Sequence, residues 1–174
     1  TVVSAYCASA RGREAAPAVF EGLDVDHHAV DHDRVNWLER YQQSLHAIEI
    51  GERFLVAPEA SLFPPESRRL RIVVPQEQAF GTGSHETTAL CIALLETVDV
   101  RGRRGLDIGS GSGILALAMH LLGARKVIAF DNDPDAYAAL RDNRARNNVP
   151  ESAMPIFIGG TDALRGGRFD MVTM

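Results

Sequence analysis

The sequence predicts an α/β protein with a doubly wound, mostly parallel sheet, and three observations lead to this prediction. From residue 70 onward, strand-like segments alternate with helix-like ones. The segment 126–130 is an almost continuous apolar run, as expected for a parallel strand buried on both faces. Glycines occupy alternate positions 109, 111 and 113, between a strand-like and a helix-like segment. We therefore expect a parallel sheet with helices on both faces.

The first 69 residues show shorter and less regular patterns. Asp33 is positioned to cap a helix that carries Trp37, and Gly51 separates the alternating Ile48 and Ile50 from the apolar run Phe54–Val56. The expected elements are a strand over 2–7, a helix over 13–23, a possible strand over 25–30, a helix over 33–45, two short strands within 46–58 and a turn or linker over 61–69.

The remaining residues alternate regularly. Asp133 followed by Pro134 predicts a helix start, because proline is favoured at the first helical position. The expected strands are 70–74, 105–108, 126–130 (ending at Asp131), 155–158 and 169–174, and the expected helices are 86–98, 113–122 and 134–147.

These patterns divide the chain into three parts: a small partial α/β segment (1–32), a linker helix with short strands (33–69) and a Rossmann-like domain (70–174). A doubly wound sheet normally continues beyond a strand such as 169–174. We therefore expect a truncated chain whose sheet is incomplete at the C-terminus.

Composition excludes several classes of protein. The hydrophobic fraction is 45% and the mean hydropathy −0.08, which permits a buried core. A net charge of −5 argues against direct nucleic-acid binding. No apolar run is long enough to span a bilayer, so we expect no membrane partner and a cytoplasmic protein.

Cys91 is expected in the core. The His27–Asp33 stretch is favoured as a solvated turn over a metal site, so no metal is expected.

The run from Leu106 to Leu115 carries the strongest chemical signal. Its spacing, Gly109-x-Gly111-x-Gly113 after Asp107, departs from the dinucleotide pattern G-x-G-x-x-G. An acidic residue here suits S-adenosylmethionine, which has no phosphate and presents an ammonium that Asp107 could attract directly or through water. Asp131, 22 residues after Gly109, could accept hydrogen bonds from both ribose hydroxyls, although a strand end and a helix cap would also explain acidic residues there.

Two further segments are more ambiguous. Asp162 follows the expected strand 155–158, and its carboxylate could accept a hydrogen bond from an adenine amino group. An ordinary turn explains an acidic residue there equally well. The run 78–91 combines glycines, hydroxyl residues and His85 before a helix. Physics alone favours a plain helix N-terminus there over a ligand loop.

Taken together, the motifs resemble the ribosomal protein L11 methyltransferase family, a class I S-adenosylmethionine-dependent group. The family's A-F-G-T-G-x-H-x-T-T-x-L-C run corresponds to Ala79–Cys91, and its D-x-G-x-G-S-G-I-L-A run to Asp107–Ala116. Trp37 and the segment 51–53 are similar to the family's linker. The resemblance implies that 1–32 is part of a substrate-recognition domain and that an Asn-Ile-Leu motif follows the strand at 169–174.

The resemblance also implies an activity: transfer of a methyl group to a lysine or amino-terminal amine, with ribosomal protein L11 as substrate. The alternatives are another protein lysine, a small molecule or a non-catalytic cofactor-binding module. His85 is a candidate proton acceptor, although a role in orienting its loop is favoured, and the sequence indicates no particular oligomeric state. The candidate cofactor-binding residues are Phe80, Gly81, Thr82, Thr88, Asp107, Gly109, Ser110, Gly111, Gly113, Asp131, Asn132 and Asp162.

Overall fold

A computed structural model of the chain describes residues 46–75, 86–164 and 166–174. The chain divides into residues 1–40 and 41–174, and everything described below belongs to the second part. The elements predicted before residue 46 lie outside the described residues. None of the helices in the described part is long and apolar enough to cross a membrane.

The elements follow the predicted order, with ends within about two residues of those expected. The sheets contain the strands β1 (Ile48–Ile50), β2 (Phe54–Ala57), β3 (Leu70–Val73), β4 (Arg104–Ile108), β5 (Lys126–Asp131), β6 (Ile156–Ile158) and β7 (Met171–Thr173). The helices are α3 (Glu86–Thr97), α4 (Ile114–Leu121) and α5 (Pro134–Arg146), with short 3-10 turns at Ala60–Leu62 and Thr161–Ala163.

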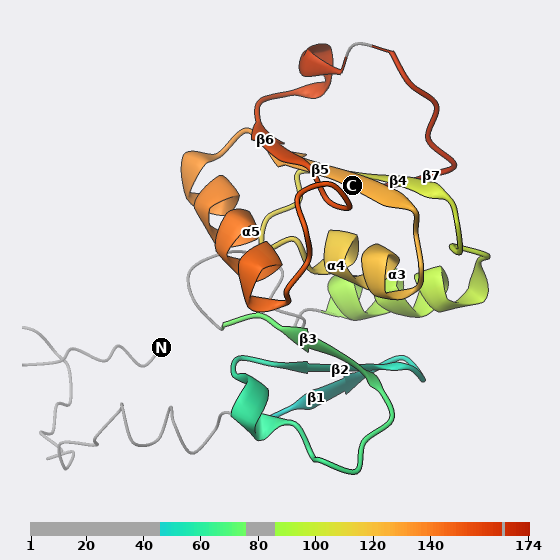
Figure 1. The fold of residues 1–174 in the computed structure, drawn as a ribbon, viewed down its shortest axis with the longest axis vertical. Coiled ribbons are helices and arrows are strands. Elements are labelled where there is room, and N and C mark those ends of the chain that lie inside the picture. The colour runs from blue at the N-terminus through green and yellow to red at the C-terminus, as the bar shows by residue number, and fades with distance from the viewer. Residues whose placement is uncertain (1–45, 76–85, 165) are drawn as a thin grey trace, which may run out of the picture. The chain divides into compact units, whose positions relative to one another are not determined.

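Four of the strands form a fully parallel sheet, in the order β6-β5-β4-β7. This confirms the predicted α/β fold with a mostly parallel sheet. Figure 1 shows α3, α4 and α5 together on one side of this sheet. The expectation of helices on both faces is therefore not met among the described residues, because all three helices share one face.

A second, three-stranded sheet is built from β1, β2 and β3. The two short strands expected around Gly51 are present, and the turn at this glycine, whose φ is +58°, returns β1 antiparallel to β2. β3 pairs parallel to β2 rather than to the four-stranded sheet. The helices lie between the two sheets, with α4 contacting β3 on one side and β4 and β5 on the other (Figure 1).

One hydrophobic core joins these layers. Leu117 and Met119 of α4 are fully buried in it, together with Ile72 of the smaller sheet and Val127 of the larger one. The contact with the larger sheet is tight: a Cβ at Gly105 would come within 2.7 Å of the Met119 sulfur. Because α4 is held on both sides, the glycine turn that precedes it has a fixed position above β4.

Candidate functional site

The candidate site lies at the carboxyl ends of β4 and β5. The chain runs outward from β4 to β5 and β6, then returns to place β7 on the opposite side of β4. Ligands of open parallel sheets bind at this kind of switch in strand order. The residues after β4 therefore occupy the place where the fold itself favours a ligand.

The glycine turn after β4 needs its glycines for geometry. Gly109, Gly111 and Gly113 all have positive φ, at +64°, +52° and +78°. A Cβ at Gly113 would collide with the side chain of Leu140 on α5, whereas a Cβ at Gly109 would meet nothing within 4 Å. Gly113 is thus needed for packing against α5, and Gly109 borders open space.

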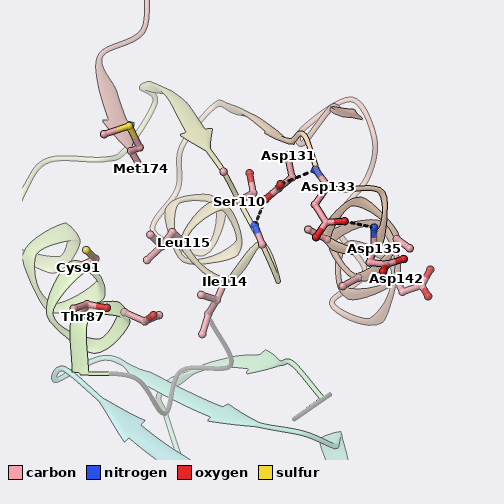
Figure 2. Close-up of a pocket in the computed structure, with 16 residues that line it drawn as sticks. Thr87, Cys91, Ser110, Ile114, Leu115, Asp131, Asp133, Asp135, Asp142 and Met174 are labelled. Atoms are coloured by element: carbon pink, nitrogen blue, oxygen red, sulfur yellow. Dashed lines mark hydrogen bonds between the residues drawn. The ribbon is translucent and has the colours of Figure 1, made fainter. Parts of the chain in front are cut away.

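Asp131, the last residue of β5, links this turn to the next helix. One carboxylate oxygen accepts a hydrogen bond from the Gly111 N–H at 2.9 Å, and the other accepts from the Asp133 N–H at 3.0 Å. Asp133 in turn accepts from the Asp135 N–H at 2.9 Å, which makes it the N-cap of α5, as predicted. Figure 2 shows these three hydrogen bonds along one wall of the pocket.

Asp107 lies beneath the turn, with only 1% of its surface exposed. Thr173 of β7 donates a hydrogen bond of 2.6 Å to its Oδ1, while Oδ2 is buried without a hydrogen-bond partner among the described residues. Burial raises the pKa of the Asp107 carboxyl from 3.8 to about 6, against the opposing effects of the Thr173 hydrogen bond and of the nearby Ala116 N–H and Ser110 hydroxyl. This burial disfavours a direct contact between Asp107 and a ligand ammonium, and the contact through water stays a prediction.

These residues border a cavity of about 740 Å³, large enough for a nucleoside-sized ligand. Its walls come from the start of α3, the glycine turn and the start of α4, the end of β5, one face of α5, and Met174 after β7 (Figure 2). The lining residues are Thr87, Thr88, Cys91, Gly109, Ser110, Gly111, Ile114, Leu115, Asp131, Asp133, Asp135, Ala136, Ala138, Ala139, Asp142 and Met174.

The cavity gathers five of the twelve predicted cofactor-binding residues: Thr88, Gly109, Ser110, Gly111 and Asp131. Four more are described but do not line it. Asp107 and Gly113 are buried, while Asn132 and Asp162 are exposed. Phe80, Gly81, Thr82 and the tentative catalytic His85 lie outside the described residues, as does the His27–Asp33 stretch. The ligand contacts of all these residues stay predictions.

The structure also brings in residues that the sequence analysis missed. Cys91 was expected in the core, but it is only half-buried and lines the cavity. Met174 reaches the cavity because β7 pairs with β4, a pairing of segments more than 60 residues apart. Thr87 could have been suspected from its place beside Thr88, whereas no local signal marks Met174.

Comparison with known proteins agrees with this geometry. A family model described as ribosomal protein L11 methyltransferase (PrmA) matches residues 7–173. The ribosomal protein L11 methyltransferase of Cellvibrio japonicus is 40% identical over 71% of this chain, and that of Synechococcus elongatus is 42% identical over 79%. The chain spans 42% and 48% of the lengths of these two relatives, less than half of each.

A solved structure shows the same fold. The crystal structure of ribosomal protein L11 methylase from Lactobacillus delbrueckii subsp. bulgaricus matches with a TM-score of 0.64 and 30% sequence identity, over 73% of this chain and 64% of that one. Family match, sequence identity and fold point to one conclusion: this chain belongs to the ribosomal protein L11 methyltransferase family.

Proposed function

We propose that the protein binds S-adenosylmethionine in this cavity and methylates an amine of a protein substrate, with ribosomal protein L11 as the expected substrate and the cytoplasm as its compartment. The observation that carries the proposal is the Asp131 carboxylate held beside the glycine turn, at the edge of open space above Gly109. A carboxylate there can accept hydrogen bonds from a ribose. Because the glycines carry no Cβ, a ligand can also come close to the protein backbone of the turn.

The charge of the cavity suits this cofactor better than a dinucleotide. Four carboxylates line it, from Asp131, Asp133, Asp135 and Asp142, of which Asp142 is paired with Arg141, and the described lining residues include no lysine or arginine. A pyrophosphate would be repelled by this set of charges, whereas a sulfonium and an ammonium would be attracted. The acidic lining of the cavity thus supports S-adenosylmethionine over a dinucleotide, as the glycine spacing also indicated.

The unpartnered Oδ2 of Asp107 gives a second test of fit. A buried carboxylate oxygen without a donor is costly, so such an atom close to a ligand site, though not lining the cavity, is a place for an ordered water that donates to it. The ammonium of S-adenosylmethionine, acting through a water, would supply such a donor. The cofactor itself supplies a methyl group already activated by its bond to a positively charged sulfur.

The chain's own residues would then mainly bind and orient. Asp131 would hold the ribose, the backbone of Gly109–Gly111 would face the amino-acid portion, and Thr88 and Cys91 would close the cavity from α3. The attacking amine must be neutral, and for an ordinary lysine this costs about 4–5 kcal/mol at pH 7. Removal from water beside a cation lowers that cost, and His85 stays a predicted proton acceptor.

The test is a methylation assay on the full-length protein with radiolabelled S-adenosylmethionine. Purified ribosomal protein L11 and a whole-cell extract are offered in parallel, with heat-denatured enzyme as control. Label in L11 supports the proposal. Label in another extract protein but not in L11 contradicts the substrate, and no label in either contradicts the proposed activity.

A further inference from the structure

Helix α5 holds the glycine turn through a buried side chain that does not line the cavity. The Asn143 carboxamide donates a hydrogen bond of 2.9 Å to the carbonyl of Ser112, and only 5% of the Asn143 surface is exposed. Leu140, three residues earlier on the same face of α5, packs so closely on Gly113 that no Cβ fits there. Helix α5 therefore contacts the turn in two ways: Leu140 packs against Gly113, and Asn143 donates a hydrogen bond to Ser112.

The Ser112–Gly113 peptide unit is held at both of its polar groups. Its carbonyl accepts from Asn143, and its N–H donates to the Ser110 carbonyl at 2.7 Å. A segment with three positive-φ glycines has many alternative backbone conformations, so its shape must be selected by contacts of this kind. Rotation of this peptide would break both hydrogen bonds and displace Ser110 and Gly111, which do line the cavity.

We propose that Asn143 is a positioning residue for the cofactor site and acts through the Ser112–Gly113 peptide rather than by touching the ligand. This inference rests on the proposed function, since it assumes that the cavity binds S-adenosylmethionine. The neighbouring Asp142 lines the cavity while Asn143 points away from it, into the protein. Its effect on binding is therefore indirect, through the shape of the turn.

The chain supplies a matched control one turn later on the same helix. Asn147 also uses its carboxamide on a backbone, accepting from the Val73 N–H and donating to the Val73 carbonyl, both at 2.8 Å. The same carboxamide also donates to the backbone carbonyl of Asn143 at 2.8 Å, so Asn147 joins the C-terminal end of α5 to β3 and makes none of these hydrogen bonds to the glycine turn. Loss of Asn147 should therefore lower stability without changing the turn.

The experiment compares Asn143→Leu, Asn143→Asp and Asn147→Leu in the full-length protein. Leucine and aspartate both have approximately the shape of the asparagine side chain but differ in polarity. Neither a leucine side chain nor a carboxylate can donate a hydrogen bond to the Ser112 carbonyl. Titration calorimetry with S-adenosylhomocysteine is done well below each variant's Tm, so that only folded protein is compared. We expect both Asn143 variants to bind about tenfold more weakly, the equivalent of about 1.4 kcal/mol, and Asn147→Leu to stay within about twofold of wild type.

Amide hydrogen exchange without ligand provides the second measurement. Asn143 variants should exchange faster at residues 110–113, and Asn147→Leu should not. Wild-type affinity with unchanged exchange in the Asn143 variants, or an equal affinity loss in Asn147→Leu, would overturn the positioning role. If wild-type protein fails to bind S-adenosylhomocysteine, the proposed function fails, and exchange at residues 110–113 still decides whether Asn143 sets the turn.

Discussion

The carboxylate of Asp131 accepts a hydrogen bond from the backbone N–H of Gly111 across 2.9 Å, and this contact joins the end of β5 to the glycine turn after β4. The residue expected to hold the ribose therefore also shapes the turn beside it. Each carboxylate oxygen has two lone pairs, so one can accept from the backbone and the other from a ligand hydroxyl. Binding and organisation of the site are linked at this side chain.

The first prediction concerns Asp131→Asn. The amide has one accepting oxygen where the carboxylate has two, and its NH₂ group would face either the Gly111 or the Asp133 N–H. We expect affinity for S-adenosylhomocysteine to fall at least about tenfold, which corresponds to about 1.4 kcal/mol. Calorimetry measures this, with Asp99→Asn as control: Asp99 is exposed, and its carboxylate forms a surface ion pair with Arg103. Equal affinity of Asp131→Asn and wild type would remove the ribose role.

The second prediction compares two glycines of the same turn. Gly113→Ala combines a positive φ with a collision against Leu140, so we expect it to lower the free energy of unfolding by about 2–4 kcal/mol. Gly109→Ala has the same backbone strain but free space around its Cβ, and should lower it by only about 1–2 kcal/mol.

Ligand binding should distinguish the same two variants. The methyl group of Gly109→Ala projects where the ligand is proposed to approach, so folded Gly109→Ala should bind S-adenosylhomocysteine markedly more weakly than wild type. Urea denaturation and calorimetry on both variants give the two quantities. A Gly109→Ala protein with wild-type affinity would show that the ligand does not approach this face of the turn.

The third prediction concerns Asp107→Asn and pH. Because burial raises the pKa of Asp107 to about 6 from 3.8, the folded state binds more protons than the unfolded state between these values. The contribution of this group to stability therefore falls as pH rises from about 4 to about 6 and is constant above. The total is at most about 3 kcal/mol, taken from the size of the shift.

Asparagine does not titrate, so the variant should lack this loss. The difference in unfolding free energy, variant minus wild type, should increase between pH 4 and pH 6 and then stay level. Urea denaturation at four or five pH values measures it, with Asp99→Asn as the control for a change in net charge. A flat difference across this range would mean that Asp107 ionises in the folded protein near its ordinary pKa.

Local sequence signals predicted the central part of this fold well. In the segment from β4 through α5, local features are enough to predict the elements: apolar strands, glycines that adopt positive φ, and an Asp133-Pro134 helix start. Asp131 and Gly109 could be assigned to one site because both follow adjacent parallel strands, whose carboxyl ends meet at one edge of the sheet.

Features that depend on distant contacts could not be predicted in this way. The partner of β3 is β2, and its last residue is held by Asn147, 74 positions away. The error at Cys91 has a different cause. Helix α3 is apolar on several sides, with Leu90 and Leu94 62% and 57% exposed, so its sequence does not reveal which side faces the core.

The last prediction concerns Glu96, near the end of α3. Its carboxylate accepts hydrogen bonds from the backbone N–H groups of Glu52 and Arg53, at 2.9 and 2.8 Å, and so ties the β1–β2 turn to this helix. Substitution by alanine leaves two N–H groups without this acceptor, but the turn is solvent-exposed and water replaces part of the loss. We therefore expect Glu96→Ala to lower the free energy of unfolding by about 1–2 kcal/mol.

Gly51→Ala tests the same contact from the other side. A Cβ at Gly51 would come within 2.5 to 2.7 Å of the Glu96 carboxylate, in addition to the strain of its positive φ. In the Glu96→Ala background this collision disappears and only the strain persists. Gly51→Ala should therefore cost less stability in that background than in wild type, and a double-mutant cycle by urea denaturation measures the difference. Strictly additive effects would show that Glu96 does not hold this turn in solution.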